Sequence, residues 1–137
     1  MTIHRRWIAL RRAARWGLPR HVRLHRRADF QRVREQGRTW ADQWLVLSAL
    51  PNGLTYSRFG FVVGKRVGKA VERNRMRRLM REAVRLHRPQ VAPGWDLVWI
   101  ARVGVAGARF ARVEQSVGAL LAEAGLLEVE PGDWAGG

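Results

Sequence analysis

A stretch of thirty residues, 59–88, joins an apolar strand pattern, a glycine- and lysine-containing loop and a densely basic helix. At about 100° per residue, the apolar side chains of the helix fall on one face. They are Met76, Leu79, Met80, Ala83 and Leu86. Residues 65–88 carry ten Lys and Arg against two Glu, which is a net +8 of the formal +15 of the chain. Such concentrated charge beside a packing face predicts a folded surface that binds a polyanion.

The opposite face of this helix is almost entirely cationic. It carries Asn74, Arg77, Arg78, Arg81, Arg85 and Arg88, with Arg73 at its edge and Arg75 nearer the apolar stripe. Like charges at successive turns repel by roughly 0.2–0.5 kcal/mol per pair, and only Glu72 and Glu82 offset them. Because an external polyanion removes this repulsion, we interpret the face as a binding surface and not as a solvated helix face.

The loop before the helix is a second candidate contact for phosphate. Its cations are Lys65, Arg66 and Lys69. Gly64 and Gly68 allow a ligand to approach the backbone, and the start of the following helix favours anions. The spacing is not that of a nucleotide-binding P-loop, since Val63 replaces the first glycine and Ala70 replaces Ser or Thr. ATP and GTP binding are therefore excluded.

Length and composition limit the remaining possibilities. A chain of 137 residues fits one domain. Cysteine is absent, so disulfides and cysteine zinc sites are excluded. The longest apolar run, 44–50, is much shorter than the roughly 20 residues that a membrane-spanning helix needs. We expect a cytoplasmic protein with no membrane partner.

Periodicity and turn signals divide the rest of the chain into short elements. We expect helices at residues 29–36, 71–88 and 110–124 and strands at 44–50, 58–64 and 95–101. Asp29 caps the first helix and Gly37 ends it, while Pro89 ends the basic helix. The first two strands are expected to pair antiparallel, and the last helix is expected to pack on the sheet.

The two ends of the chain differ in charge. Residues 1–28 contain nine arginines and no acid, whereas residues from 113 onward contain five acids and no Lys or Arg. We expect a basic arm at residues 1–20, a domain at 21–126 and a tail at 127–137.

The acids and histidines do not form a recognisable nuclease centre. A protein nuclease usually needs clustered carboxylates for Mg²⁺ or a pair of histidines. The acids before residue 113 are scattered as Asp29, Glu35, Asp42, Glu72, Glu82 and Asp96. Three histidines precede residue 26, and His87 stands alone at a helix end. The sequence therefore predicts no catalytic residue and no metal site in the protein.

Three blocks of sequence resemble the protein subunit of bacterial ribonuclease P. They are Arg-Phe-Gly-Phe at 58–61, Lys-Arg-Val-Gly-Lys-Ala-Val-Glu-Arg-Asn-Arg at 65–75 and Arg-Arg-Leu-Met-Arg-Glu at 77–82. The centre of the match is the RNR signature of that family, here Arg73, Asn74 and Arg75. Flanking segments at 23–30 and 96–102 extend the resemblance over about residues 20–125.

The resemblance implies an α/β (α+β sandwich) fold with the order αβββαβα. A four-stranded sheet is packed with helices and contains a left-handed βαβ crossover, which is an exception to the usual right-handed rule. The fourth strand is then a short one near residues 38–40.

The resemblance also implies a function and two groups of site residues. The protein would bind a large catalytic RNA, which with Mg²⁺ cleaves precursor tRNA, and would help to hold the 5′ leader without being the catalyst or binding a cofactor. Contacts to the catalytic RNA would come from Lys65, Arg66, Lys69, Arg73, Asn74, Arg75, Arg77, Arg78, Arg81 and Arg85. The leader would lie in a cleft between the first helix and the sheet, lined by Phe30, Arg34, Trp44, Val46, Ser48 and Phe61.

Two of these cleft positions depart from the family pattern. Arg34 stands where some relatives carry an aromatic residue, and Ser48 stands where others carry tyrosine. Phe30 matches the aromatic residue of the family cleft, and strand alternation places Trp44 and Val46 on one side. The alternative is a non-catalytic RNA-binding protein of another ribonucleoprotein, such as the ribosome.

Overall fold

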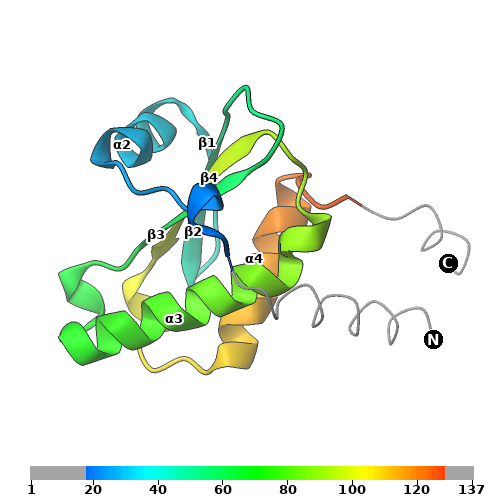
Figure 1. The fold of residues 1–137 in the computed structure, drawn as a ribbon. Helices are drawn as coiled ribbons and strands as arrows, with labels where there is room; N and C mark the ends of the chain where they lie inside the picture. The colour runs from blue at the N-terminus through cyan, green and yellow to red at the C-terminus, as the bar shows by residue number, and fades with distance from the viewer. Residues whose placement is uncertain (1–17, 129–137) are drawn as a thin grey trace, which may run out of the picture.

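A computed structural model describes residues 18–128 as a four-stranded sheet with helices on both faces (Figure 1). The elements are α2 (Arg27–Gln36), β1 (Arg38–Ala41), β2 (Leu45–Pro51), β3 (Arg58–Val62), α3 (Ala70–His87), β4 (Trp95–Ala101) and α4 (Phe110–Glu123). This order confirms the predicted fold class αβββαβα, including the short first strand. The residues outside 18–128 contain most of the predicted basic arm and of the predicted tail.

The strands lie in the order β1-β2-β4-β3. β2 is antiparallel to both β1 and β4, whereas β3 is parallel to β4 and is joined to it through α3, as a βαβ crossover. The predicted pairing of β2 with β3 is wrong, because β4 lies between them. The physical reason is burial: Leu97, Val98 and Trp99 are fully buried, so β4 is covered on both faces and needs a central position.

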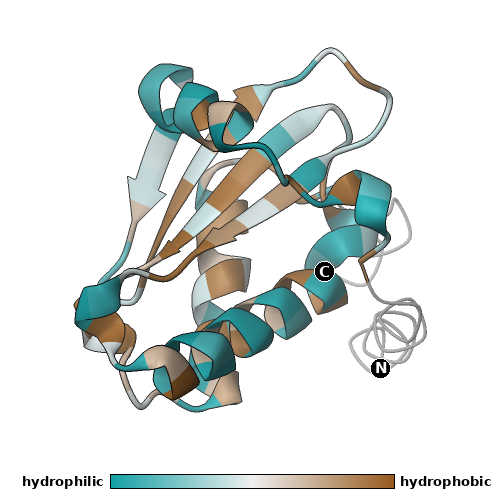
Figure 2. Ribbon diagram, turned by 60° about the vertical axis from the view of Figure 1, so that its left-hand side comes forward, coloured by the Kyte–Doolittle hydropathy of each residue, from teal (hydrophilic) through white to brown (hydrophobic). Residues whose placement is uncertain are grey.

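α3 and α4 cover one face of the sheet, and α2 covers part of the other (Figure 2). Residues 45, 47, 59, 97 and 99 of the strands form the larger core with α3 and α4. Met76, Met80 and Ala83 are buried as predicted, but Val84 is fully buried where Leu86 stays half-buried. The predicted packing of the terminal helix is confirmed, since Val113, Val117, Leu120 and Leu121 are buried.

The described chain is attached to this core at both ends. Leu18 and Val22 are buried in the larger core, so the fold includes residues of the predicted arm. At the other end, Leu127 forms a bridge with Val91. The predicted cap of the first helix is wrong: α2 begins two residues before Asp29, which instead lies in the first turn, where the helix dipole favours an acid.

One buried carboxylate connects α2, β3 and the loop after β2 to the central strand. Asp96, at the start of β4, has a fully buried side chain. It accepts hydrogen bonds from Arg58 Nε at 2.9 Å and Nη2 at 2.7 Å, from Arg32 Nη2 at 2.8 Å and from Asn52 Nδ2 at 3.0 Å. Burial by itself raises the pKa of Asp96, but these hydrogen bonds and the charge of Arg58 outweigh it and hold the pKa below its ordinary value.

We expect Asp96→Asn to lower the free energy of unfolding at pH 7 by roughly 3 kcal/mol, the lower end of the cost of breaking a buried ion pair. The lower end applies because Arg58 and Arg32 are 24% and 35% exposed. Since the folded-state pKa is lowered, the stabilisation is present above the unfolded pKa of about 3.9 and is lost as pH falls through the folded value. Urea denaturation at several pH values measures both effects.

The control for this substitution is Asp29→Asn. Its carboxylate faces Arg32 at 3.5 Å and is partly exposed, so the loss should be about 0.5 kcal/mol. An Asp96→Asn variant as stable as the original chain at pH 7 would show that the buried carboxylate is not needed.

Candidate nucleic-acid interface

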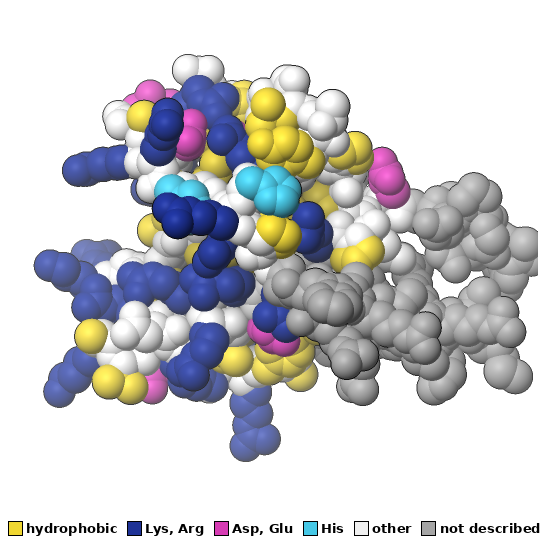
Figure 3. All heavy atoms as spheres, in the orientation of Figure 1, with side chains coloured by type: hydrophobic (Ala, Val, Ile, Leu, Met, Phe, Trp, Pro, Cys, Tyr) yellow, Lys and Arg dark blue, Asp and Glu magenta, His cyan; other side chains and the backbone are white. Residues whose placement is uncertain are grey.

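The predicted RNA-binding cations all lie on α3 or on the turn that precedes it. We call this set the α3 surface: Lys65, Arg66, Lys69, Arg73, Asn74, Arg75, Arg77, Arg78, Arg81 and Arg85. Four of the cations are exposed, namely Lys65, Arg66, Lys69 and Arg78. Figure 3 shows Lys and Arg side chains projecting along α3 and over the region above it. The structure therefore places the ten residues on one continuous segment, from the turn before α3 to the last turn of that helix.

Three of the half-buried arginines of the α3 surface are held by polar contacts within the protein. Arg75 donates a hydrogen bond to the carbonyl oxygen of Ala108 at 2.9 Å. Arg77 donates to the side-chain oxygen of Asn74 at 2.9 Å. Arg85 pairs with Glu82 at 3.2 Å. These contacts fix the direction of the side chains, so a polyanion binding here meets cations that are already ordered.

A cleft of about 900 Å³ lies at the end of the sheet, on the face that carries α2. Its apolar floor includes Val62 of β3 and Ile100 of β4, which are partners in the sheet. Its rim carries Arg34, Lys65, Arg66 and Arg102. We call it the α2 cleft. An apolar floor with a cationic rim suits a single nucleic-acid strand, whose bases and phosphates need these two environments.

Three of the six predicted cleft residues lie on this side of the sheet in reach of solvent. Arg34 is exposed on α2 and lines the cleft, Phe30 lies one turn earlier, and Val46 is the sheet partner of Ile100. Ser48 is on the same face but is buried, and its hydroxyl lies 3.2 Å from that of Thr39. Ser48 is therefore a structural residue.

Trp44 and Phe61 do not belong to the cleft, because both pack against the larger core on the other face. Trp44 lies under Arg112 of α4, at 5.1 Å from the guanidinium carbon. Its backbone N–H donates to the Asp42 carboxylate at 2.7 Å, which turns the chain before β2 begins, so strand alternation does not extend to residue 44. Phe61 lies beneath α3, with Arg81 at 6.0 Å from its ring.

Sequence reasoning missed Val62, Ile100, Gln43 and Arg102, which line the cleft. Val62 and Ile100 meet only because β3 and β4 are parallel neighbours, and that pairing was not predicted. The alternation of the strands indicates their face but not their partner.

Phe30 is fixed by direct contact with the backbone of β3. A Cβ atom at Gly60 would lie 2.5 Å from Cε1 and 2.7 Å from Cζ of the Phe30 ring. Only glycine leaves room for the ring at this place. Phe30 also packs in a small core with Leu24, Val33 and Val98, so α2 is held at a defined height above the sheet.

Residues 18–128 contain neither a membrane-spanning helix nor a cluster of metal ligands. No helix there is both long and apolar enough to cross a membrane. No group of three or more His, Asp or Glu side chains in the same range could hold a metal ion.

The fold and the two surfaces define a basic α+β domain of the nucleic-acid-binding class, with a cationic helix on one side and a cleft on the other. Residues 18–125 match the family model described as Ribonuclease P. The chain belongs to the ribonuclease P protein family, as the RNR signature predicted.

Similar proteins support this assignment over most of the chain. The ribonuclease P protein component of Roseiflexus castenholzii is 49% identical over 112 residues, covering 81% of this chain and 92% of the relative. The solved structure of the Staphylococcus aureus RNase P protein has a TM-score of 0.72 at 28% identity, covering 78% of this chain and 98% of that one. The RNase P protein from Thermotoga maritima has a TM-score of 0.68 at 31% identity, covering 74% and 96%.

Membership of this family gives the chain its place in an enzyme. A ribonuclease P protein component associates with the ribonuclease P RNA, and the holoenzyme processes the 5′ ends of tRNA. The comparisons give no support to the alternative of a ribosomal or other ribonucleoprotein component.

We expect Gly60→Ala to lower the free energy of unfolding by about 1–3 kcal/mol, because the added methyl group overlaps the Phe30 ring. In a Phe30→Ala background the same change should cost much less, since the ring is gone. Urea denaturation of the original chain, the two single variants and the double variant gives the coupling energy between residues 30 and 60. We expect it to be about 1 kcal/mol or more. Gly64→Ala is the control, because its Cβ atom meets nothing within 4 Å and should be additive with Phe30→Ala. Equal costs of Gly60→Ala in both backgrounds would refute the contact.

Proposed function

We propose that the chain acts in ribonuclease P through two surfaces, which meet at Lys65 and Arg66. The α3 surface binds the catalytic RNA, and the α2 cleft holds the 5′ leader of precursor tRNA. The observation that carries this proposal is the position of the two surfaces on opposite faces of one sheet, which lets a single domain contact two RNA segments at once.

The α3 surface suits a folded RNA because its cations lie along an 18-residue helix. Such a row can follow the phosphates of a structured RNA, and neutralising them releases counterions. Four exposed cations make no ion pair within residues 18–128: Lys65, Arg66, Lys69 and Arg78. They remain available for phosphate.

The α2 cleft suits an unpaired strand for a different reason. Val62 and Ile100 offer apolar contact to bases, and Arg34 and Arg102 offer charge to the backbone. Phe30 and Arg34 also line a smaller hollow beside α2, so the strand can pass from the cleft onto the helix. A leader of variable sequence is held well by such contacts, because they read no base edge.

Chemistry at the phosphodiester is assigned to the RNA and its Mg²⁺. The donor set of the described residues does not fit a metal of the protein's own, since no group of three or more His, Asp or Glu forms. We assign binding and orientation to the chain, and we place its action on tRNA precursors in the cytoplasm as part of this proposal.

We expect the purified chain alone not to cleave precursor tRNA, but to increase cleavage by a bacterial ribonuclease P RNA at low Mg²⁺. The physical reason is that cationic side chains replace part of the counterion atmosphere that the RNA otherwise takes from Mg²⁺. The measurement is the single-turnover rate with and without protein across a Mg²⁺ series. Cleavage by protein free of RNA would overturn this division of labour.

Variants of the two surfaces should separate the two RNA partners. Lys69→Ala with Arg78→Ala should weaken binding to the catalytic RNA and reduce its log–log salt slope by about 2, one for each phosphate contact. Phe30→Ala or Arg34→Ala should instead weaken holoenzyme binding to precursor tRNA, about tenfold for a lost stacking contact, and leave mature tRNA unaffected.

Arg38→Ala is the control for these variants, because Arg38 is exposed on β1, at the sheet edge opposite β3, and belongs to neither surface. Equal losses for precursor and mature tRNA in both groups of variants would refute the two-surface arrangement.

A further inference from the structure

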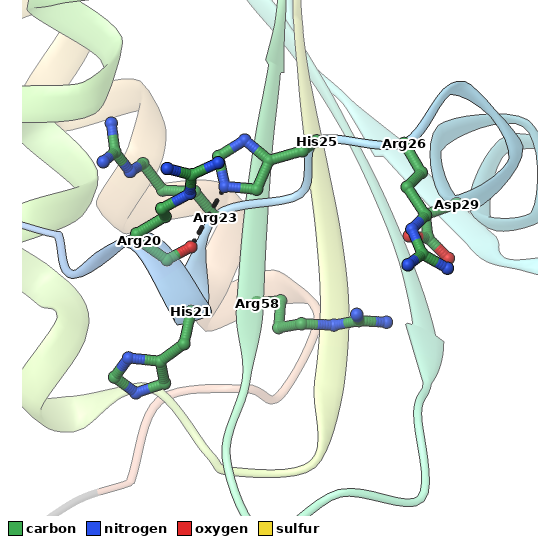
Figure 4. A pocket seen from close by; sticks show the side chains of 7 residues that line it. All are labelled: Arg20, His21, Arg23, His25, Arg26, Asp29 and Arg58. Atoms are coloured by element: carbon green, nitrogen blue, oxygen red, sulfur yellow. Dashed lines mark hydrogen bonds between the residues drawn. The ribbon is translucent and has the colours of Figure 1, made fainter.

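A third basic feature, separate from the α3 surface and the α2 cleft, lies beside the start of α2. It is an open pocket of about 700 Å³ lined by four arginines, two histidines and one aspartate (Figure 4). The arginines are Arg20, Arg23, Arg26 and Arg58. With neutral histidines the lining carries three net positive charges. We call it the basic pocket.

The pocket is built on a fixed backbone. Residues before α2 run along the open edge of β3, where the N–H of Leu24 donates to the carbonyl oxygen of Phe59 at 2.8 Å. Val22 and Leu24 are buried on either side of Arg23. His25 Nε2 lies 3.1 Å from the carbonyl oxygen of Arg20, which closes the turn (Figure 4). The arginines are therefore held around the opening by ordered chain.

The acids near this pocket are already neutralised, whereas most of its arginines are not. Asp29 pairs with Arg32 at 3.5 Å, and Arg58 is bound to the buried Asp96. Arg20, Arg23 and Arg26 form no ion pair within residues 18–128. The Nε atom of Arg23 is buried without a hydrogen-bond partner in the described chain. Arg20 and Arg23 lie at one end of the pocket and Arg26 at the other (Figure 4), so the uncompensated guanidinium groups favour an extended polyanion.

The first turn of α2 adds to this field. Arg26 and Asp29 of the pocket lie on either side of the start of the helix, which has no side-chain cap. The positive end of the helix dipole therefore adds to the charge of the arginines.

The position of the pocket suggests which anion it takes. Val62 of the cleft, Gly60 beneath Phe30 and Arg58 of the pocket are alternate residues of β3 and share one face. Arg58 and Val62 are then about 13 Å apart along the strand, close enough for one RNA chain to span. Figure 3 shows Lys and Arg side chains both along α3 and over the region above it, on one side of the molecule.

We infer that the basic pocket is a phosphate-binding site for an RNA backbone, and the third RNA contact of the domain. Its arginines bind the phosphodiester oxygens, and no bond is made or broken. The phosphate comes either from the catalytic RNA or from precursor tRNA. Only this choice of source depends on the proposed function; the chemistry of the pocket does not.

The direct test uses Arg20→Gln with Arg26→Gln, two exposed residues whose loss leaves the core intact. The probe is a uridine pentanucleotide, compared with its uncharged methylphosphonate analogue, and the arginine Nε–H signals of the full chain are followed by NMR. We expect the pentanucleotide, but not the analogue, to shift the Arg23 and Arg58 signals. The double variant should lower the log–log salt slope of pentanucleotide binding by about 1.4, as expected for two contacts to a single strand.

The matched control is Arg109→Gln with Arg112→Gln, which removes the same charge on exposed residues of the α4 side. If the two double variants bind the pentanucleotide equally, or if the analogue shifts the same signals, the phosphate site is refuted.

The source of the phosphate is found with the whole complex. A loss of affinity for the ribonuclease P RNA in the Arg20→Gln, Arg26→Gln variant assigns the phosphate to that RNA, and a loss for precursor tRNA by the assembled enzyme assigns it to the substrate. No loss relative to the control in either measurement overturns the inference. If the original chain did not increase cleavage of precursor tRNA by the ribonuclease P RNA, the proposed function would be refuted instead. The pentanucleotide measurement would still decide whether the pocket binds phosphate.

Discussion

The carboxylate of Asp96 is the contact on which the rest of the α2 face depends. It is buried at the start of the central strand and takes hydrogen bonds from α2, from β3 and from the loop between β2 and β3. A buried charge is costly unless its partners surround it, so the three segments have one favourable arrangement. That arrangement fixes the distance between α2 and the sheet. The same distance determines the contact of Phe30 with Gly60 and the position of the cleft edge that α2 forms. It also keeps the negative charge away from any RNA, because Arg58 and Arg32 lie between the carboxylate and solvent.

The central position of β4 has a similar influence on the other face. Since β3 must be parallel to β4, the chain has to cross the sheet between them, and α3 makes that crossing. α3 packs against the core through Met76, Met80 and Val84, so its charged side has one fixed orientation. Core packing and a dense positive charge are thus properties of the same helix. The hydrogen bond from Arg75 to the carbonyl oxygen of Ala108 is an example, because it joins a residue of the RNR signature to the segment before α4.

The sequence predicted the structure best where the spacing of apolar residues along one helix is enough to define that helix. The spacing of Met76, Met80 and Ala83 and the stop at Pro89 predict α3 and the side on which its arginines lie. The cleft could not be predicted in the same way, because it depends on which strands are neighbours. Alternation places Phe61 on the same face as Phe59 and Val63, and the structure shows that this face belongs to the core. Register then brings Val62 to Ile100, a contact that no local pattern encodes.

The distribution of acids explains how a chain with eleven of them can still present cationic surfaces. On α3, Glu72 and Glu82 lie 3.9 Å and 3.2 Å from Arg75 and Arg85, two half-buried arginines. The acids are therefore placed beside cations that the protein itself already orders. Exposed cations of the same surface, such as Arg78, have no acid partner within residues 18–128. Glu72 and Glu82 thus lie beside half-buried arginines, while the exposed cations of the helix keep their full charge, so ion pairing and exposed charge are supplied by different side chains of one helix.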